Sequence, residues 1–180
     1  MTRQLGRTIR LSIGLHWFTV LLFVAAYATI ELREVFPKDS APREMMKSWH
    51  YMAGLSIFAV AWLRLILRAL TQSGSQFEAT SGWQAWASKV THVALYVLMF
   101  VLPLLGWLTL SANGDTIPFF GFNLPALIGP NDRIAEFFEE SHEVIAKIGY
   151  GLIGIHSLAA LVHHYVLRDS TLSRMLPTRS

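Results

Sequence analysis

Histidine is the residue type in this 180-residue chain best suited to chemistry, because the chain has seven histidines and no cysteine. The lack of cysteine excludes disulfide scaffolds, thiolate zinc sites and Cys-ligated iron–sulfur clusters, so any bound metal must use His or carboxylate ligands. His16, His50, His142 and His156 fall within or at the ends of long apolar segments. Ionisable side chains inside membrane spans are rare and usually functional, so these four are candidate metal ligands.

His142 and His156 are 14 residues apart on one predicted helix. At about 100° and 1.5 Å per residue, this spacing returns to within about 40° of the same face and separates the two side chains by about 21 Å. Gly149 lies midway between them on that face, where the lack of a side chain would leave room for a bulky planar group on either side. Two candidate metal ligands therefore lie on one face of the helix at two depths, and each requires a partner ligand from another helix.

The predicted topology supplies one partner for each. His50 begins the second apolar helix at the depth of His142, and His16 lies within two turns of the other end of the first helix, near the depth of His156. Two His–His pairs, one above the other in a helix bundle, suit two haem irons with imidazole at both axial positions. Zinc fits poorly, because four ligands cannot converge from two pairs about 20 Å apart. Each histidine taken alone is also explained by a hydrogen bond to the backbone.

Four apolar segments must position these histidines. Charged residues make up 15% of the chain and hydrophobic residues 53%, whereas a soluble domain has about 25% charged residues. A bilayer core about 30 Å thick needs roughly 20 apolar helical residues. We expect transmembrane helices over residues 11–31, 49–70, 88–112 and 131–168. The predicted fold is an all-α membrane protein, one four-helix bundle formed by the single domain 1–180.

Basic residues predict how the bundle is oriented in the membrane. With both termini in the cytoplasm, that side holds Arg3, Arg7, Arg10, Arg64, Arg68, Lys89, Arg168, Arg174 and Arg179, and the opposite side holds Arg33, Lys38, Arg43, Lys47, Arg133 and Lys147. The positive-inside rule therefore favours an N-in, C-in orientation. These residues flank apolar runs rather than gathering on one surface, so nucleic acid is not an expected partner and membrane lipid is.

The first apolar segment has a second interpretation as a signal peptide. Three arginines precede it, and it ends in Ala26-Tyr27-Ala28, which has the small residues of a cleavage site. The apolar run is longer than the usual signal segment of about 7 to 15 residues, and it carries His16. We therefore favour a membrane-spanning helix.

Further hydrogen-bond donors gather at the predicted cytoplasmic end. Arg64 lies 14 residues after His50 on the second helix, which makes it a candidate partner for a haem propionate or a quinone. His92 opens the third helix there, and His163, His164 and Tyr165 close the fourth. A quinone that accepts two electrons also takes up two protons, and histidine can donate and recover protons near neutral pH. The alternatives are an arginine that extends to the interface and histidines that anchor helix ends there.

The segment between the third and fourth helices is apolar but short. Ile117 to Leu127 contains three phenylalanines and two prolines, and we expect it to lie at the outer membrane interface. Pro130-Asn131-Asp132 follows, with the residue types that begin a helix.

In these residues the chain resembles the small bacterial cytochrome b561 family of four-helix inner-membrane dihaem proteins, over nearly its full length. The matching stretches are Ser12 to Trp17, His50, Arg64 to Arg68, His142-Glu143, Gly149-Tyr150, Ile155-His156, Ala159 to Tyr165, Arg168-Asp169, Leu172 and Arg174 to Pro177. The stretch from Ala159 onward is similar to the branch whose enzymes, the superoxide oxidases, pass electrons from superoxide to ubiquinone.

The resemblance implies that His16 and His156 bind the iron of an inner haem and that His50 and His142 bind the iron of an outer haem. Both haems would be b-type and noncovalent, because no cysteine is available for thioether attachment. The resemblance also implies a quinone acceptor, for which His163, His164 and Arg64, with His92, are the candidate residues. Superoxide as the periplasmic donor rests on the resemblance alone.

Three function classes follow. The first is a superoxide:quinone oxidoreductase that moves electrons from a periplasmic donor through the outer and then the inner haem to ubiquinone. The second is a non-catalytic cytochrome subunit that anchors a periplasmic dehydrogenase and relays its electrons. The third, a haem-free structural or transport bundle, leaves the two depth-matched histidine pairs unexplained.

Overall fold

The computed structural model describes residues 2–71 and 82–176 and contains four long helices. They are α1 (Thr2–Leu32), α2 (Ala41–Thr71), α3 (Trp83–Asn113) and α4 (Asp132–Tyr165). Each is long and apolar enough to cross a membrane. The prediction of an all-α protein with four membrane spans is confirmed. Pro177 and Arg179, which the sequence analysis named, lie outside the described residues.

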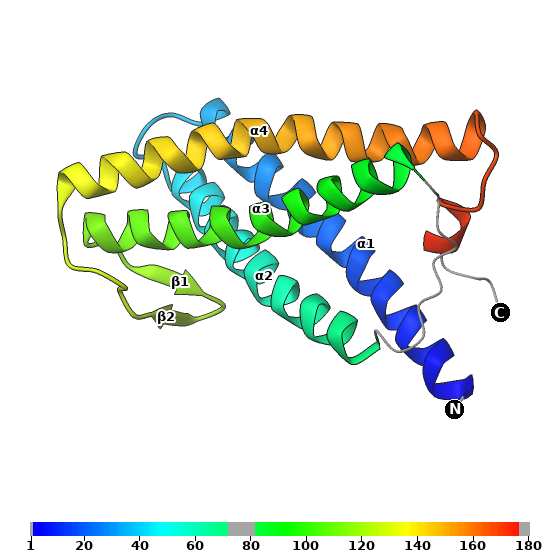
Figure 1. Cartoon of the computed structure of the whole chain (residues 1–180). Helices are drawn as coiled ribbons and strands as arrows, with labels where there is room; N and C mark the ends of the chain where they lie inside the picture. The colour runs from blue at the N-terminus through cyan, green and yellow to red at the C-terminus, as the bar shows by residue number, and fades with distance from the viewer. Residues whose placement is uncertain (1, 72–81, 177–180) are drawn as a thin grey trace.

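The helices pack as two pairs, α1 with α2 and α3 with α4, and α2 packs against α3 to join the pairs. In Figure 1 the start of α1 and the end of α4 lie at the same end of the bundle, which we call the terminus end. The opposite end carries two short strands and is called the hairpin end. α4 fully buries only Ala135 and Gly149 among its residues, although it crosses the whole bundle.

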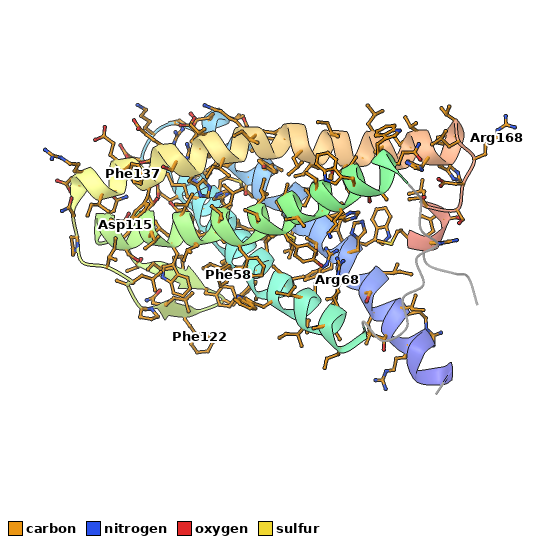
Figure 2. All side chains as sticks on the ribbon, viewed as in Figure 1. Phe58, Arg68, Asp115, Phe122, Phe137 and Arg168 are labelled. Carbon is orange, nitrogen blue, oxygen red and sulfur yellow. The ribbon has the colours of Figure 1, made fainter. Side chains whose placement is uncertain are left out.

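Small residues bring α1, α2 and α3 together. Ala26, Ala53, Ile57, Ala61 and Met99 form one buried cluster near the middle of the bundle. Small side chains allow helix backbones in a membrane to approach closely, and the resulting contacts stabilise the bundle by dispersion. Aromatic rings pack beside this cluster, where Phe58 contacts Phe100 with ring centroids 5.7 Å apart. Figure 2 shows Phe58 on α2 beneath α3.

A β-hairpin, rather than a flat interfacial segment, follows α3. Strand β1 (Ile117–Phe119) pairs antiparallel with β2 (Phe122–Leu124), and Ile117 is opposite Leu124. The intervening Phe120 and Gly121 both have positive φ, which suits a tight two-residue turn. Ile117 is buried with Leu55 and Leu110, so β1 covers the hairpin end of α2 and α3.

The tip of the hairpin differs from its base. Phe120 and Phe122 are 66% and 76% exposed, and Figure 2 shows Phe122 projecting away from the bundle. At the base, the Trp107 indole donates to the Pro125 carbonyl at 3.0 Å, and the Leu127 amide donates to the Ser111 hydroxyl at 3.1 Å. The hairpin is therefore tied to α3 while its aromatic tip remains available to the membrane interface.

The helices extend beyond most of the predicted bounds, which marked apolar runs rather than helix ends. α1 begins at Thr2 instead of residue 11, and α2 begins at Ala41 instead of residue 49, with Pro42 in its first turn where proline is favoured. The fourth helix ends at Tyr165 rather than Arg168. Arg168 has φ of 54°, a left-handed conformation that cannot continue a right-handed helix.

Exposed aromatic residues mark both ends of the spans. Trp83 and Trp86 lie at the terminus end of α3 and are 77% and 69% exposed, and Trp49 lies near the hairpin end of α2 and is also exposed. Tryptophan is enriched where the lipid headgroups meet the hydrocarbon core. These exposed tryptophans at both ends agree with helices that are long and apolar enough to cross a bilayer.

Candidate functional site: two histidine pairs

At the hairpin end, His50 of α2 faces His142 of α4. The ring centroids are 6.1 Å apart and the ring planes are inclined at 72°. Two imidazoles bound on opposite sides of one metal, each at about 2 Å, would have centroids roughly 6 Å apart. The pair therefore has the separation of two ligands that share one metal, rather than that of two directly hydrogen-bonded rings.

Both rings of this pair are anchored through Nδ1. His50 Nδ1 donates to the Ala26 carbonyl at 2.8 Å, and His142 Nδ1 donates to the Leu102 carbonyl at 2.9 Å. A carbonyl oxygen can only accept, so the hydrogen must be on Nδ1 in each ring. The Nε2 lone pair of each ring is then available for a metal, and the carbonyl fixes ring orientation as in known metal-bound histidines.

Gly106 explains how His142 reaches the backbone of α3. Gly106 lies one turn after Leu102 on α3, and a Cβ built on Gly106 would lie 3.4 Å from His142 Cε1 and 3.5 Å from Nδ1. Any side chain there would therefore press on the ring. The glycine lets the imidazole lie against α3 and donate to the Leu102 carbonyl.

At the terminus end, His16 of α1 faces His156 of α4 with centroids 6.4 Å apart and planes inclined at 66°. His92 of α3 is also close to His156, at a centroid distance of 5.4 Å. Within the described part of the chain, neither His16 nor His156 makes a hydrogen bond through its ring, whereas His92 Nδ1 donates to the Ser88 carbonyl at 2.7 Å. This second pair has a metal-bridging separation, and a third imidazole stands beside it.

Arg64 lies near the terminus-end pair but binds neither histidine directly. Its guanidinium donates to the Thr19 hydroxyl at 3.1 Å and stands over the Tyr96 ring, 5.7 Å from the centroid. It is close enough to act electrostatically on both His16 and His156. Arg64 therefore places a positive charge beside this pair, on a half-buried side chain held by α1 and α3.

The remaining histidines have partners other than Arg64 and His92. His163 Nδ1 donates to Asp169 Oδ2 at 2.5 Å, and the His164 ring packs edge-on against Tyr165 with centroids 4.8 Å apart. In residues 2–71 and 82–176, no hydrogen bond joins either histidine to Arg64. The predicted donors thus share the terminus end, and each has its own local contacts there.

An aromatic layer separates the two pairs. Gly149 is seven residues from both His142 and His156. A Cβ on Gly149 would lie 2.5 Å from Tyr27 Oη and 2.8 Å from Leu98 Cδ1, so these two side chains occupy the space directly beside Gly149. Tyr27 donates to the Ala146 carbonyl at 3.0 Å.

Tyr150 continues this layer toward the surface. Its ring stacks on Tyr27 with centroids 4.1 Å apart, and its hydroxyl donates to Glu31 at 2.8 Å. The layer joins α1 to α4 midway between the histidine pairs, where the two helices make few other contacts.

Basic side chains at the hairpin end are largely paired with acids. Arg33 Nε and Arg43 Nη2 both bind Glu34 at 2.9 Å, and Lys47 and Lys147 bind Glu44 and Glu143. Paired charges produce a weaker field at a distance than isolated ones. An anionic donor would therefore meet little long-range steering from these four residues.

Comparison with known proteins identifies the family. A profile of the family described as prokaryotic cytochrome b561 matches residues 7–178. The chain belongs to the prokaryotic cytochrome b561 family. It is 38% identical over 175 residues to cytochrome b561 homolog 1 of Escherichia coli strain K12, with 97% of this chain and 99% of that protein covered. It is 33% identical over 169 residues to a protein of Yersinia pestis named probable superoxide oxidase CybB, covering 94% and 95% of the two chains.

The residues of this cytochrome fit the b-type haem that its family implies. Two histidine pairs stand at metal-bridging separations, and the pair at the hairpin end has its Nε2 lone pairs available. Among the described residues, no group of three or more His, Asp or Glu side chains could hold a free metal ion. Two protein ligands per metal suit an iron whose other four ligands come from a porphyrin.

Several features of this cytochrome were not found from its sequence. The sequence does not identify Asp169 as a histidine partner, because the two residues meet only where the chain reverses at Arg168. The carbonyls of Ala26 and Leu102 are backbone groups, so residue type does not mark them as acceptors. Gly106 could have been noticed, since a glycine within an apolar helix often marks a close approach. The Tyr27 layer gave no pattern that distinguishes it from ordinary aromatic packing.

Proposed function

We propose that this cytochrome is a membrane oxidoreductase that takes electrons from superoxide at the hairpin end and delivers them to ubiquinone at the terminus end. The observation that carries the proposal is the pair of His–His contacts at metal-bridging separation, one at each end of the bundle. The net reaction is two superoxide anions, one quinone and two protons giving two dioxygen molecules and one quinol. The name of the Yersinia pestis relative supports superoxide as the donor.

In this proposal His50 and His142 hold one b-type haem, and His16 and His156 hold the other. Bound haem supplies reversible one-electron transfer, which is the chemistry that connects a one-electron donor to a two-electron acceptor. The carbonyls of Ala26 and Leu102 fix the ring orientation of the first pair and raise its basicity as ligands. Arg64 supplies positive charge beside the second pair, suited to a propionate or a quinone oxygen.

The orientation belongs to the same proposal. We place the terminus end in the cytoplasm, supported by the excess of Lys and Arg on that side. Quinone reduction then draws its protons from the cytoplasmic side, where His92, His163 and His164 lie near the ends of α3 and α4. The hairpin end faces the periplasm, where a small donor would reach the His50–His142 pair.

The experiment uses the purified full chain in lipid nanodiscs with superoxide generated in solution and ubiquinone-1 as acceptor. We expect quinol formation at one quinol per two superoxide anions, and we expect superoxide dismutase to abolish it. Absence of quinol formation by protein that retains its haems would reject superoxide as the donor.

One observation favours the second candidate function, a cytochrome subunit that relays electrons from a periplasmic dehydrogenase. The hairpin tip exposes Phe120 and Phe122, and Phe137 on the neighbouring part of α4 is 64% exposed. Exposed aromatic side chains are frequent at protein interfaces. Under this alternative, superoxide does not drive quinone reduction, and a stoichiometric protein partner copurifies with the chain. Phe122→Ser should then abolish copurification of the partner.

A further inference from the structure

The chain turns back on itself after α4 and forms a small structured tail. Arg168 takes the left-handed conformation that reverses the chain, and Figure 2 shows it at the far end of α4. A short 3-10 helix, Ser173–Met175, follows. The Trp17 indole donates to the Met175 carbonyl at 2.7 Å, which fastens the tail to α1. The tail therefore covers part of the terminus end.

This reversal brings Asp169 against His163. His163 Nδ1 donates to Asp169 Oδ2, and the other carboxylate oxygen accepts from the Thr171 amide at 2.8 Å. The Asp169 amide in turn donates to the His163 carbonyl at 3.0 Å. His163 and Asp169 are thus joined by both a side-chain and a backbone hydrogen bond, which fixes their relative position.

The carboxylate is ionised in this arrangement. The hydrogen bond from His163, followed by those from Thr171, lowers the pKa of Asp169 to about 2. An ionised carboxylate can only accept, so the hydrogen at this contact is on His163 Nδ1. Nε2 is then the nitrogen through which His163 exchanges protons with other groups.

The position of His163 relates this pair to the second histidine site. His163 is seven residues after His156, so it lies about 10 Å further along α4 and within about 20° of the same face. Its side chain is 25% exposed, so it contacts both the bundle and water. A residue that donates protons to a quinone beside the His16–His156 pair must face the bundle, where the quinone binds, and water, which returns the protons.

We propose that Asp169 is a positioning residue that holds His163 with Nε2 directed to proton exchange, so that His163 protonates the quinone at the terminus end. This inference rests on the proposed function, because it assumes that a quinone is reduced there. Its new content is the role of the tail, which brings a carboxylate to a histidine on the preceding helix.

The proton balance is as follows. His163 with hydrogens on both nitrogens gives its Nε2 proton to a quinone carbonyl oxygen and becomes neutral, with Nδ1–H still bound to Asp169. Water at the terminus end returns a proton to Nε2. Two such cycles supply the two protons that accompany the two electrons delivered to the quinone, and Asp169 itself gains and loses none.

The variant that tests this role is Asp169→Asn. Its amide oxygen can still accept from the Thr171 amide, while its NH2 group meets His163 Nδ1 and favours the opposite tautomer. Asp132→Asn, the same chemical change in the first turn of α4, is the matched control at the hairpin end. His163→Ala removes the proton donor itself.

The measurement is reoxidation of chemically prereduced protein by ubiquinone-1 in stopped flow. We expect Asp169→Asn to lower the maximal rate of reoxidation at least about tenfold. A correctly positioned acid contributes roughly a hundredfold or more to a rate, and the variant should lose part of that contribution. The quinone concentration at half-maximal rate should change little. Haem content and optical spectra should equal those of the parent. The ¹⁵N ring signals of His163 should report Nδ1–H in the parent and Nε2–H in the variant.

The outcomes separate this inference from the proposed function. If His163→Ala slows reoxidation while Asp169→Asn matches the parent, the role of Asp169 is rejected and the quinone site stands. If both variants match the parent, the quinone site near His163 is rejected as well. If Asp169→Asn raises only the half-saturating quinone concentration, Asp169 shapes binding and the positioning role is overturned.

Discussion

The two histidine pairs have nearly equal ring separations, 6.1 and 6.4 Å, but unlike surroundings. At the hairpin end, both rings donate to backbone carbonyls, and Gly106 fits against one ring. At the terminus end, His16 and His156 lack such anchors within the described residues, and they share their surroundings with His92 and Arg64.

Under the proposed function, this difference divides the redox task between the two ends of the bundle. Fixed ring orientation suits a site that only receives and passes electrons, because little reorganisation is then needed. A site that also serves proton uptake needs additional donors and access to water, which His92 and the tail around His163 provide. We therefore expect changes to either histidine pair to act on haem binding, and changes to the other donors at the terminus end to act mainly on quinone chemistry.

The largest expected effects come from removing a proposed ligand. His142→Ala or His50→Ala should remove the haem at the hairpin end, and His16→Ala or His156→Ala should remove the one at the terminus end. In each case haem content should fall from two to about one per chain, because one imidazole rarely retains haem in a site built for two. Pyridine haemochrome assay and low-temperature spectra of the purified variants measure this loss.

His16→Ala sharpens the comparison further, because the His92 ring lies nearer to His156, at 5.4 Å between centroids, than the His16 ring does at 6.4 Å. The matched control is His164→Ala, whose ring packs on Tyr165 outside both pairs. Loss of the hairpin-end haem in His156→Ala, or retention of both haems in His142→Ala, would contradict the proposed pairing.

Gly149→Ala tests the layer between the two pairs. The new methyl group would lie 2.5 Å from Tyr27 Oη, so Tyr27 must move and lose its hydrogen bond to Ala146. We expect a loss of about 2 kcal/mol of stability, typical of overpacking in a well-filled interior. Thermal unfolding in detergent measures it, with Gly151→Ala as control, since nothing lies within 4 Å of a Cβ there. Equal melting temperatures for the two variants would show that the layer adapts freely.

Gly106→Ala should have a smaller effect, confined to the hairpin end. A Cβ at 3.4 Å from the His142 ring would push the ring away from the Leu102 carbonyl by a few tenths of an ångström. Loss of such a supporting hydrogen bond typically costs about tenfold in metal affinity or more. Potentiometric titration should show a shifted midpoint for one haem and an unchanged midpoint for the other. A shift of the terminus-end haem alone would be incompatible with the close contact at Gly106.

The smallest expected effect is a pH dependence of the tail. The pKa of Asp169, about 2, lies below its ordinary value of 3.8, so the stability that the Asp169 contacts contribute is complete above pH 4 and lost as the pH falls toward 2. A spin label at Ser173→Cys, specific because the chain has no other cysteine, should become more mobile over that range. The same label in Asp169→Asn should be mobile at both pH values, and a transition near pH 6 would point to another group.

The histidine pairs could be predicted because side chains on membrane-spanning helices obey helix geometry. The spacing of His142 and His156 fixes one face, and depth alone then selects His50 and His16, which the structure brings next to them. The four spans were equally accessible, since hydropathy depends on composition rather than on tertiary contacts.

The features that escaped prediction depend on chain reversals and close approaches. The hairpin needs a positive φ at Phe120, and phenylalanine has no preference for that conformation. The His163–Asp169 pair needs the left-handed conformation of Arg168. The Gly149 contact depends on where Tyr27 of a distant helix comes to lie. Such details are set by the packing of the whole bundle rather than by any local pattern.

The most direct test of the central claim, one b-type haem at each histidine pair, is haem stoichiometry of the parent protein. Full-length chain purified in mild detergent is quantified by amino-acid analysis and its haem by the pyridine haemochrome assay. The account predicts two noncovalent b-type haems per chain, both extracted by acid acetone. One haem per chain, or none, would contradict it.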